Sequence, residues 1–138
     1  MSETLAALRS LPLTDLSEDE RMFRDQVRQF AESEVRPLVG KMDKEAQIPR
    51  SLIDHCFEMG IMGIEIPDAH GGAGATFFMS VLAVEELARV DASVAVIADV
   101  QNTLVNNALL RWGSDDLKAR YLPKLASSWV GAYALSEA

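Results

Sequence analysis

The fold class of this chain is indicated most directly by the stretch Ala92-Ser-Val-Ala-Val-Ile-Ala-Asp-Val-Gln-Asn-Thr-Leu-Val-Asn-Asn-Ala-Leu-Leu-Arg-Trp112. Side chains on a helix advance by about 100° per residue, so four apolar residues share one face: Ile97, Val100, Leu104 and Ala108. Gln101 falls inside that face, whereas Asn102, Thr103 and Asn106 project away from it and are expected to be exposed. The stretch therefore predicts one long helix with an amide on its apolar side, and that amide needs an explanation.

Helix signals flank this stretch on both sides. Gly113 ends the long helix, and Ser114 caps the next one. Towards the N-terminus, Thr76 caps a helix with a broad apolar stripe, and Asp91 separates that helix from the long one. The middle of the chain therefore predicts three consecutive helices.

Two more helices are predicted nearer the N-terminus. Ser17 and Glu20 match a capping box, and apolar residues follow at helical spacing: Phe23, Val27, Phe30 and Ala31. Pro37 should end or kink this helix, because proline lacks the backbone donor and its ring collides with the preceding turn. A second helix begins near Pro49 and stops at Gly60. The fold class that follows is all-α and bundle-like.

Composition limits the classes of protein to consider. The chain has 138 residues, 49% of them apolar and 25% charged, which suits one globular domain with a sizeable core. Its net charge of −8 is expected to repel nucleic acid and anionic lipid. Its single cysteine, Cys56, cannot form an internal disulfide, and no apolar run approaches the roughly 20 residues of a bilayer span. We therefore expect a soluble protein from a reducing compartment, with no nucleic-acid or membrane partner.

The last ten residues differ in character from the rest. The run 129–138 is rich in small and apolar residues without helical spacing, and it predicts a strand. A strand needs a neighbour to pair its backbone donors and acceptors, and the rest of the chain offers none. The sequence is therefore expected to divide into an N-terminal extension (1–15), a helical domain (16–128) and the truncated start of a β domain (129–138).

Few residues form a constellation that could carry chemistry. The glycine-rich loop 68–76 could present backbone N–H groups to a phosphate, but it lacks the Lys-Ser/Thr pair of a P-loop, so an ordinary flexible loop is favoured. Cys56 and its neighbour His55 point about 100° apart on a helix, which favours a core cysteine over a thiol–imidazole pair. His55 and His70 have no ligand-type spacing, so we expect no metal site.

Two pairs of adjacent carboxylates also have an ordinary interpretation. Glu85-Glu86 and Asp115-Asp116 are expected to be solvated helix faces, the second pair at the positive end of a helix. Only Gln101 stands out among the polar residues. No complete catalytic constellation follows from the residues alone.

Six motifs resemble those of the acyl-CoA dehydrogenase family and occur in its order and spacing. They are Met62-Gly-Ile-Glu-Ile-Pro67, Gly71-Gly72-Ala-Gly74, Val84-Glu-Glu-Leu-Ala-Arg-Val-Asp-Ala-Ser93, Trp112-Gly-Ser-Asp-Asp-Leu-Lys118, Tyr121-Leu-Pro-Lys124 and Tyr133-Ala-Leu-Ser-Glu-Ala138. The match begins at Leu16 and covers nearly everything that follows. The stretches Asp91-Ala-Ser-Val94 and Val100-Gln-Asn-Thr-Leu104 resemble the short/branched-chain members in particular.

The resemblance implies an FAD-dependent flavoenzyme of three domains, assembled as a homotetramer, of which this chain is the N-terminal helical domain. Such an enzyme converts a short or branched-chain acyl-CoA to the trans-2-enoyl-CoA and passes electrons to an electron-transfer flavoprotein. Its catalytic glutamate would lie in the C-terminal domain, so no catalytic residue is assigned to this chain. A role in fatty acid metabolism or branched-chain amino acid catabolism implies the mitochondrial matrix or the bacterial cytoplasm.

The resemblance also implies binding residues. The family's aromatic-x-Leu-Ser-Glu segment matches the end of this chain, where Tyr133, Leu135 and Ser136 should contact the isoalloxazine edge of FAD. Helix 92–112 would form one wall of the acyl cavity through four residues: Ile97, Val100, Gln101 and Leu104. A glutaryl-type substrate is not expected, because this face offers Asp99 and no arginine. The alternative is a free-standing helical interaction module descended from such an enzyme, whose apolar surfaces a partner would cover.

Overall fold

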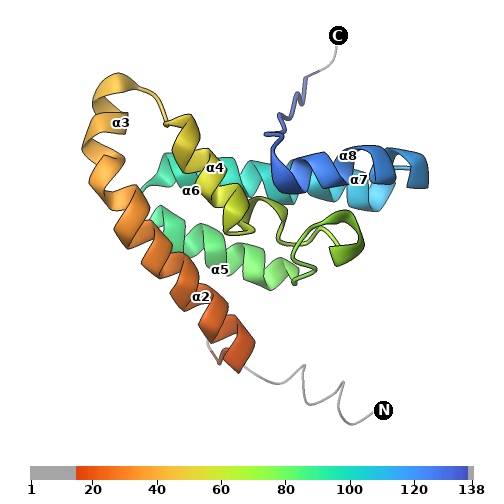
Figure 1. Cartoon of the computed structure of the whole chain (residues 1–138), viewed down its shortest axis with the longest axis horizontal. Coiled ribbons are helices and arrows are strands. Elements are labelled where there is room, and N and C mark those ends of the chain that lie inside the picture. The colour runs from red at the N-terminus through yellow and green to blue at the C-terminus, as the bar shows by residue number, and fades with distance from the viewer. Residues whose placement is uncertain (1–14, 137–138) are drawn as a thin grey trace.

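The computed structural model describes residues 15–136, and every regular element in this range is a helix. The α-helices in chain order are α2 (Glu18–Phe30), α3 (Val39–Glu45), α4 (Arg50–Glu58), α5 (Phe77–Ala88), α6 (Ala92–Asp99), α7 (Asn107–Trp112) and α8 (Asp115–Ser127). Helix α5 packs against both α2 and α6, and α8 packs against α4 and α7 (Figure 1). The predicted all-α fold is confirmed.

Side-chain caps begin four helices where the sequence predicts them. Ser17 Oγ accepts from Glu20 N at 3.2 Å, and Glu20 Oε2 accepts from Ser17 N at 2.8 Å, which completes the capping box. Thr76, Asp91 and Ser114 each accept from the backbone N–H three residues on, at 3.3, 2.9 and 3.3 Å. Because the first N–H groups of a helix have no partner within it, these caps determine where each helix starts.

Of the two effects predicted for Pro37, it does not end the helical run but distorts it, because the helix type changes around this residue. Helix α2 passes into a π-helical turn (Ala31–Val35), a 3-10 turn (Arg36–Leu38) and then α3. Pro37 is the second residue of the 3-10 turn, and the change of helix type accommodates its missing N–H group. The following helix, α4, has Pro49 as its N-cap and ends just before Gly60, as predicted.

The single long helix predicted over 92–112 is divided into three parts. Helix α6 is followed by a π-helical segment (Val100–Asn106) and then by α7. Asn102 and Asn106 are buried, and Leu104 is 39% exposed, so the prediction that these two asparagines are exposed is wrong. A π-helix closes its hydrogen bonds over five residues instead of four, and it therefore rotates its side chains relative to α-helical spacing.

The core consists of two clusters. The larger cluster packs side chains of α2, α4, α5 and α6 around the run Ile61–Ile64. The smaller cluster lies beneath α8 and contains Ile66, Leu122, Leu125 and Ala126. Residues 61–66, which begin with a 3-10 helix (Ile61–Gly63), contribute to both clusters. This central run therefore lies where the two clusters meet.

The strand predicted over 129–138 is not formed in the part of this run that the structure describes. Residues 129–136 have no regular secondary structure, and they leave the end of α8 and extend away from the helical body (Figure 1). Residues 15–136 contain no other strand to pair with this run, and an unpaired strand has no partners for its backbone. Glu137 and Ala138 lie outside the described residues, as do residues 1–14 of the expected extension.

Candidate functional site

Gln101 joins the π-helical segment to the chain that follows α8. Its side chain is fully buried. Nε2 donates to the carbonyl oxygens of Leu125 and Trp129, both at 2.9 Å, and Oε1 accepts from Gly131 N at 2.7 Å. Carbonyl groups in the last turn of a helix have no partner within that helix. The Gln101 amide therefore gives the carbonyl oxygen of Leu125, in the last turn of α8, a hydrogen-bond donor. These contacts explain why a polar residue stands among apolar ones.

Two asparagines of the same segment hold the central run. Asn102 Nδ2 donates to Ile61 O at 2.7 Å, and its Oδ1 accepts from Ile64 N at 3.0 Å. Asn106 Nδ2 donates to Met62 O at 2.9 Å. Sequence reasoning missed both residues, although their spacing of four, which places them on one helix face, was the signal available.

The predicted flavin-contacting residues lie on the run that Gln101 anchors. Tyr133 is 52% exposed and Leu135 is 78% exposed, and Ser136 is exposed as well. Within the range 15–136, the backbone groups of residues 132–136 make no hydrogen bond. This run therefore presents two large apolar side chains next to backbone donors and acceptors that have no partner among residues 15–136.

The four residues predicted for the acyl-cavity wall fall into two kinds. Ile97 and Val100 are half-buried and Leu104 is 39% exposed, so these three offer apolar surface. Gln101 offers none, because its side chain is covered and its amide is engaged by the backbone at residues 125, 129 and 131. Of the four predicted residues, Gln101 is therefore the one whose side chain has no exposed surface.

The glycine-rich loop does not form a phosphate cradle. Its five successive N–H groups from Gly71 to Ala75 all donate to backbone carbonyl oxygens, at 2.8 to 3.2 Å; the acceptors are Asp68, Pro67, Gly63, Ile66 and Ile64. A cradle requires N–H groups that are free to point at an anion. The loop is therefore structural, and its hydrogen bonds tie it to the central run.

One carboxylate that the sequence predicts to be solvated is buried. Glu86 on α5 is 3% exposed, and Arg28 of α2 donates to its two oxygens from Nε at 2.8 Å and from Nη2 at 2.7 Å. These hydrogen bonds hold the pKa of Glu86 below its ordinary value, although burial acts in the opposite direction. The prediction was wrong for Glu86 because its partner is 58 residues away, whereas Glu85, Asp115 and Asp116 are exposed as expected.

Cys56 is a core residue, as predicted. Its side chain is 4% exposed within the larger cluster, and burial raises the pKa of its thiol to about 12. The neighbouring His55 is exposed and lies 3.9 Å from a carboxylate oxygen of Glu34. No thiolate nucleophile is available here at neutral pH.

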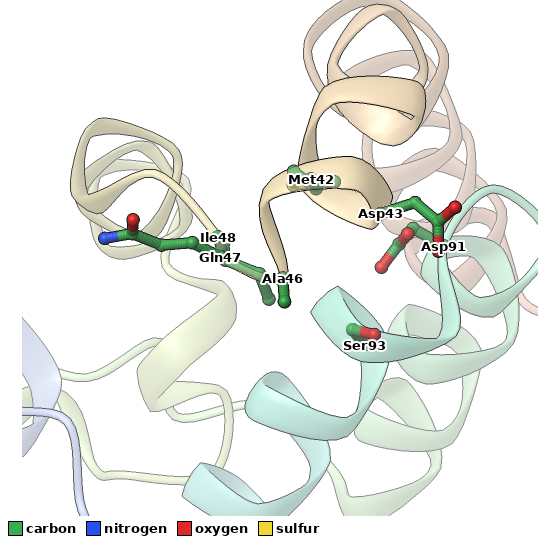
Figure 2. Close-up of a pocket in the computed structure, with 7 residues that line it drawn as sticks. All are labelled: Met42, Asp43, Ala46, Gln47, Ile48, Asp91 and Ser93. Carbon is green, nitrogen blue, oxygen red and sulfur yellow. The ribbon is translucent and has the colours of Figure 1, made fainter.

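A concave site lies between the end of α3 and the start of α6 (Figure 2). It has a cavity volume of about 380 Å³ and is lined by Met42, Asp43, Ala46, Gln47, Ile48, Asp91 and Ser93. Asp91 already caps α6, and none of the site residues predicted from the sequence lines this cavity. Since it holds no nucleophile–base pair, we assign it no catalytic role.

Residues 15–136 contain neither a metal-binding cluster nor a membrane-spanning helix. No group of three or more His, Cys, Asp or Glu side chains in this range could hold a metal ion. No helix in the same range has the length and apolar character needed to cross a bilayer. The candidate site is the surface formed by the π-helical segment and the run 129–136, which exposes Leu104, Tyr133 and Leu135.

Comparison with known proteins identifies the class to which this helical fold belongs. Residues 17–128 match the family model of the acyl-CoA dehydrogenase N-terminal domain. The chain therefore belongs to the acyl-CoA dehydrogenase family, and the resemblance seen in its motifs is confirmed.

Individual members of the family are similar to this chain in sequence and in structure. The chain is 46% identical over 126 residues to the mitochondrial short/branched chain specific acyl-CoA dehydrogenase of Bos taurus, an alignment that covers 91% of this chain and 29% of the relative. Among solved structures it is similar to butyryl-CoA dehydrogenase from Megasphaera elsdenii, with a TM-score of 0.76 and 29% identity over 81% of this chain and 30% of the other. It is also similar to glutaryl-CoA dehydrogenase from Mycobacterium smegmatis in complex with FADH2, with a TM-score of 0.75 and 30% identity over 81% of this chain and 29% of the other. The chain thus spans about 30% of the length of the proteins that it matches.

Proposed function

We propose that this chain forms the N-terminal helical part of an FAD-dependent acyl-CoA dehydrogenase for short or branched-chain substrates. The reaction is α,β-dehydrogenation of the acyl thioester to the trans-2-enoyl-CoA. The observation that carries the proposal is the 46% identity to a short/branched chain specific enzyme over 91% of this chain. No carboxylate of this chain is assigned as the catalytic base.

The run 132–136 has the properties that a flavin-contacting segment needs. FAD, when bound, accepts the hydride that leaves the acyl chain. The exposed side chains of Tyr133 and Leu135 offer apolar contact to a planar ring. The backbone at Leu135 and Ser136, which has no partner among residues 15–136, can hydrogen-bond the polar edge of that ring. The Ser136 hydroxyl adds a further donor and acceptor. These residues therefore fit the flavin edge.

The wall of the acyl cavity is assigned to Ile97, Val100 and Leu104. Their apolar surface is available, and an apolar pocket discriminates between acyl chains by roughly 1 to 3 kcal/mol per methylene. Leu104→Ala should therefore widen acyl selectivity without abolishing turnover. Competition kinetics with straight and branched acyl-CoAs measure this effect, and an unchanged ratio of kcat/KM values would argue against the assignment.

The partners of the proposed enzyme follow from the same family membership. We propose that it passes electrons to an electron-transfer flavoprotein and assembles as a homotetramer. Its compartment would be the mitochondrial matrix or the bacterial cytoplasm, in fatty acid metabolism or branched-chain amino acid catabolism. The domain limits proposed from the sequence, with a helical domain over 16–128 and the start of a β domain at 129, belong to this proposal.

The function is tested by the visible spectrum of the complete natural protein that contains this sequence. A flavin absorption band that bleaches when a short branched acyl-CoA is added without oxygen is the expected result. A protein that purifies without flavin and does not bind added FAD would contradict the proposal.

The alternative of a free-standing interaction module makes a different prediction. It is favoured by the apolar side chains that this chain leaves exposed, among them Val96 at 56% and Trp112 at 86%. Sedimentation separates the two functions. A concentration-dependent oligomer without flavin supports the module, whereas a yellow tetramer of larger subunits supports the enzyme.

A further inference from the structure

The run that follows α8 is anchored at its start and free further on. Ser128 O accepts from Arg50 Nη2 at 3.0 Å, and Lys124 Nζ lies 4.6 Å from the ring centroid of Trp129. Gln101 adds its hydrogen bonds to Trp129 O and Gly131 N. Beyond Gly131 the side chains are exposed, so the position of residues 132–136 depends on the anchors at 128–131.

Gly131 also fits closely against the π-helical segment. A Cβ atom at this position would lie 2.4 Å from Val105 Cγ1 and 2.8 Å from Cγ2, which is closer than such atoms approach one another. A glycine is therefore required for Gly131 N to reach Gln101 Oε1. A hydrogen bond to Gln101 and close packing against Val105 thus fix Gly131 on the π-helical segment.

The same segment carries part of the proposed acyl-cavity wall. Val100 precedes Gln101 directly, and Leu104 follows it three residues later. From Gly131 to Ser136 the chain can extend over at most about 18 Å. A shift of Gly131 relative to Gln101 would therefore move the flavin-contacting residues relative to Val100 and Leu104.

We propose that Gln101 is a positioning residue, which sets the place of the flavin-contacting run relative to the acyl-cavity wall. It touches neither ligand and acts through the backbone of Trp129 and Gly131. The inference rests on the proposed function, because it takes Tyr133, Leu135 and Ser136 as the residues that meet the flavin. It explains why a fully buried amide of the π-helical segment lies directly beside the proposed acyl-contacting residues.

The direct test replaces Gln101 by glutamate in the complete natural protein that contains this sequence. Gln101→Glu preserves the size of the side chain and an acceptor for Gly131 N, but it places a carboxylate oxygen against the carbonyl oxygens of Leu125 and Trp129. We expect at least tenfold weaker FAD binding in fluorescence titration of the apoprotein, and a shifted visible flavin band. With butyryl-CoA as the probe, kcat should fall while KM stays within twofold.

Thr103→Val is the matched control. Thr103 lies in the same π-helical segment. Among the described residues its hydroxyl hydrogen-bonds to Asp99 alone, through the carbonyl oxygen at 2.8 Å and Oδ1 at 2.9 Å. Valine has nearly the same shape, so this variant removes hydrogen bonds from the segment without touching the anchors of the run. FAD binding and the flavin spectrum should match those of the unmodified protein.

A second variant approaches the same contact from the other side. Gly131→Ala should push the run away from Val105 and produce the same loss of FAD affinity. Adding Val105→Ala should restore part of it by removing Cγ1 and Cγ2, while Cβ of residue 105, which lies 2.9 Å from the added Cβ, remains. These two variants test whether the contact with Gly131 positions the run even if Gln101→Glu does not fold.

One result would overturn the proposed role of Gln101. That result is an FAD affinity within twofold of the Thr103→Val control, with no shift of the flavin band, in Gln101→Glu or in Gly131→Ala. It would show that the contact does not position the flavin-contacting run. A complete natural protein that never binds FAD would instead contradict the proposed function, before any variant is compared.

Discussion

Gly72 lies so close to the central run that no side chain fits there. A Cβ atom would come within 2.1 Å of Ile66 O and 2.4 Å of Ile66 Cβ, and Ile66 is fully buried. We expect Gly72→Ala to lower the free energy of unfolding by more than about 2 kcal/mol, as measured by denaturant titration. Gly40→Ala is the control, because nothing lies within 4 Å of a Cβ there and alanine favours a helix by about 1 kcal/mol. Equal effects of the two substitutions would contradict the close approach.

The buried thiol of Cys56 makes a second prediction at this scale. Burial raises its pKa to about 12 by disfavouring the thiolate, which is the reactive form. At pH 8 the folded protein should therefore react with a thiol reagent such as DTNB only as fast as it unfolds. Addition of guanidinium should release one reactive thiol per chain, which is the internal control. Rapid reaction of the native protein would show that the side chain is accessible.

At the scale of elements, the ion pair between α2 and α5 couples stability to pH. Hydrogen bonds from Arg28 lower the pKa of Glu86, so the stabilisation is present above the ordinary carboxyl pKa of about 4.3 and is lost as the pH falls through the lower folded value. Glu86→Gln should lower the free energy of unfolding by about 2 kcal/mol at pH 7. This difference should stay constant down to about pH 5 and shrink below pH 4, as measured by denaturant titration across that range.

The neighbouring residue supplies the control for this pair. Glu85 is exposed on the same helix, so Glu85→Gln should change stability by less than about 0.5 kcal/mol at every pH. A Glu86→Gln variant as stable as Glu85→Gln at pH 7 would show that the contact between Arg28 and Glu86 does not stabilise the fold.

At the scale of the whole molecule, the two core clusters should differ in stability. The cluster beneath α8 is the smaller one and is joined to the rest through the central run and the amides of Gln101, Asn102 and Asn106. Local opening is easier where less apolar surface is buried. Amides around Leu122 should therefore exchange with solvent deuterium at a free energy at least about 1 kcal/mol lower than those around Leu87. The same free energy for both helices would mean that the molecule opens only as one unit.

Much of the helical architecture could be predicted because its signals are local. A capping side chain and the N–H group that it accepts from lie three residues apart, so Ser17, Thr76, Asp91 and Ser114 mark their helices without any tertiary information. Motif order likewise predicted the family. The π-helical segment could not be predicted in this way, because its side chains hydrogen-bond to the backbone of elements far away in the sequence.

The sequence by itself therefore determined the all-helical class, the starts of the helices, the core position of Cys56 and the family. The tertiary structure alone decided that Glu86, Asn102 and Asn106 are buried and that the glycine-rich loop pairs with the central run. It also decided that Gln101 holds the chain after α8. The physical reason is the separation of the partners, since Gln101 meets Leu125 across 24 residues and Arg28 meets Glu86 across 58. Contacts over such distances satisfy buried polar groups only after the helices have packed.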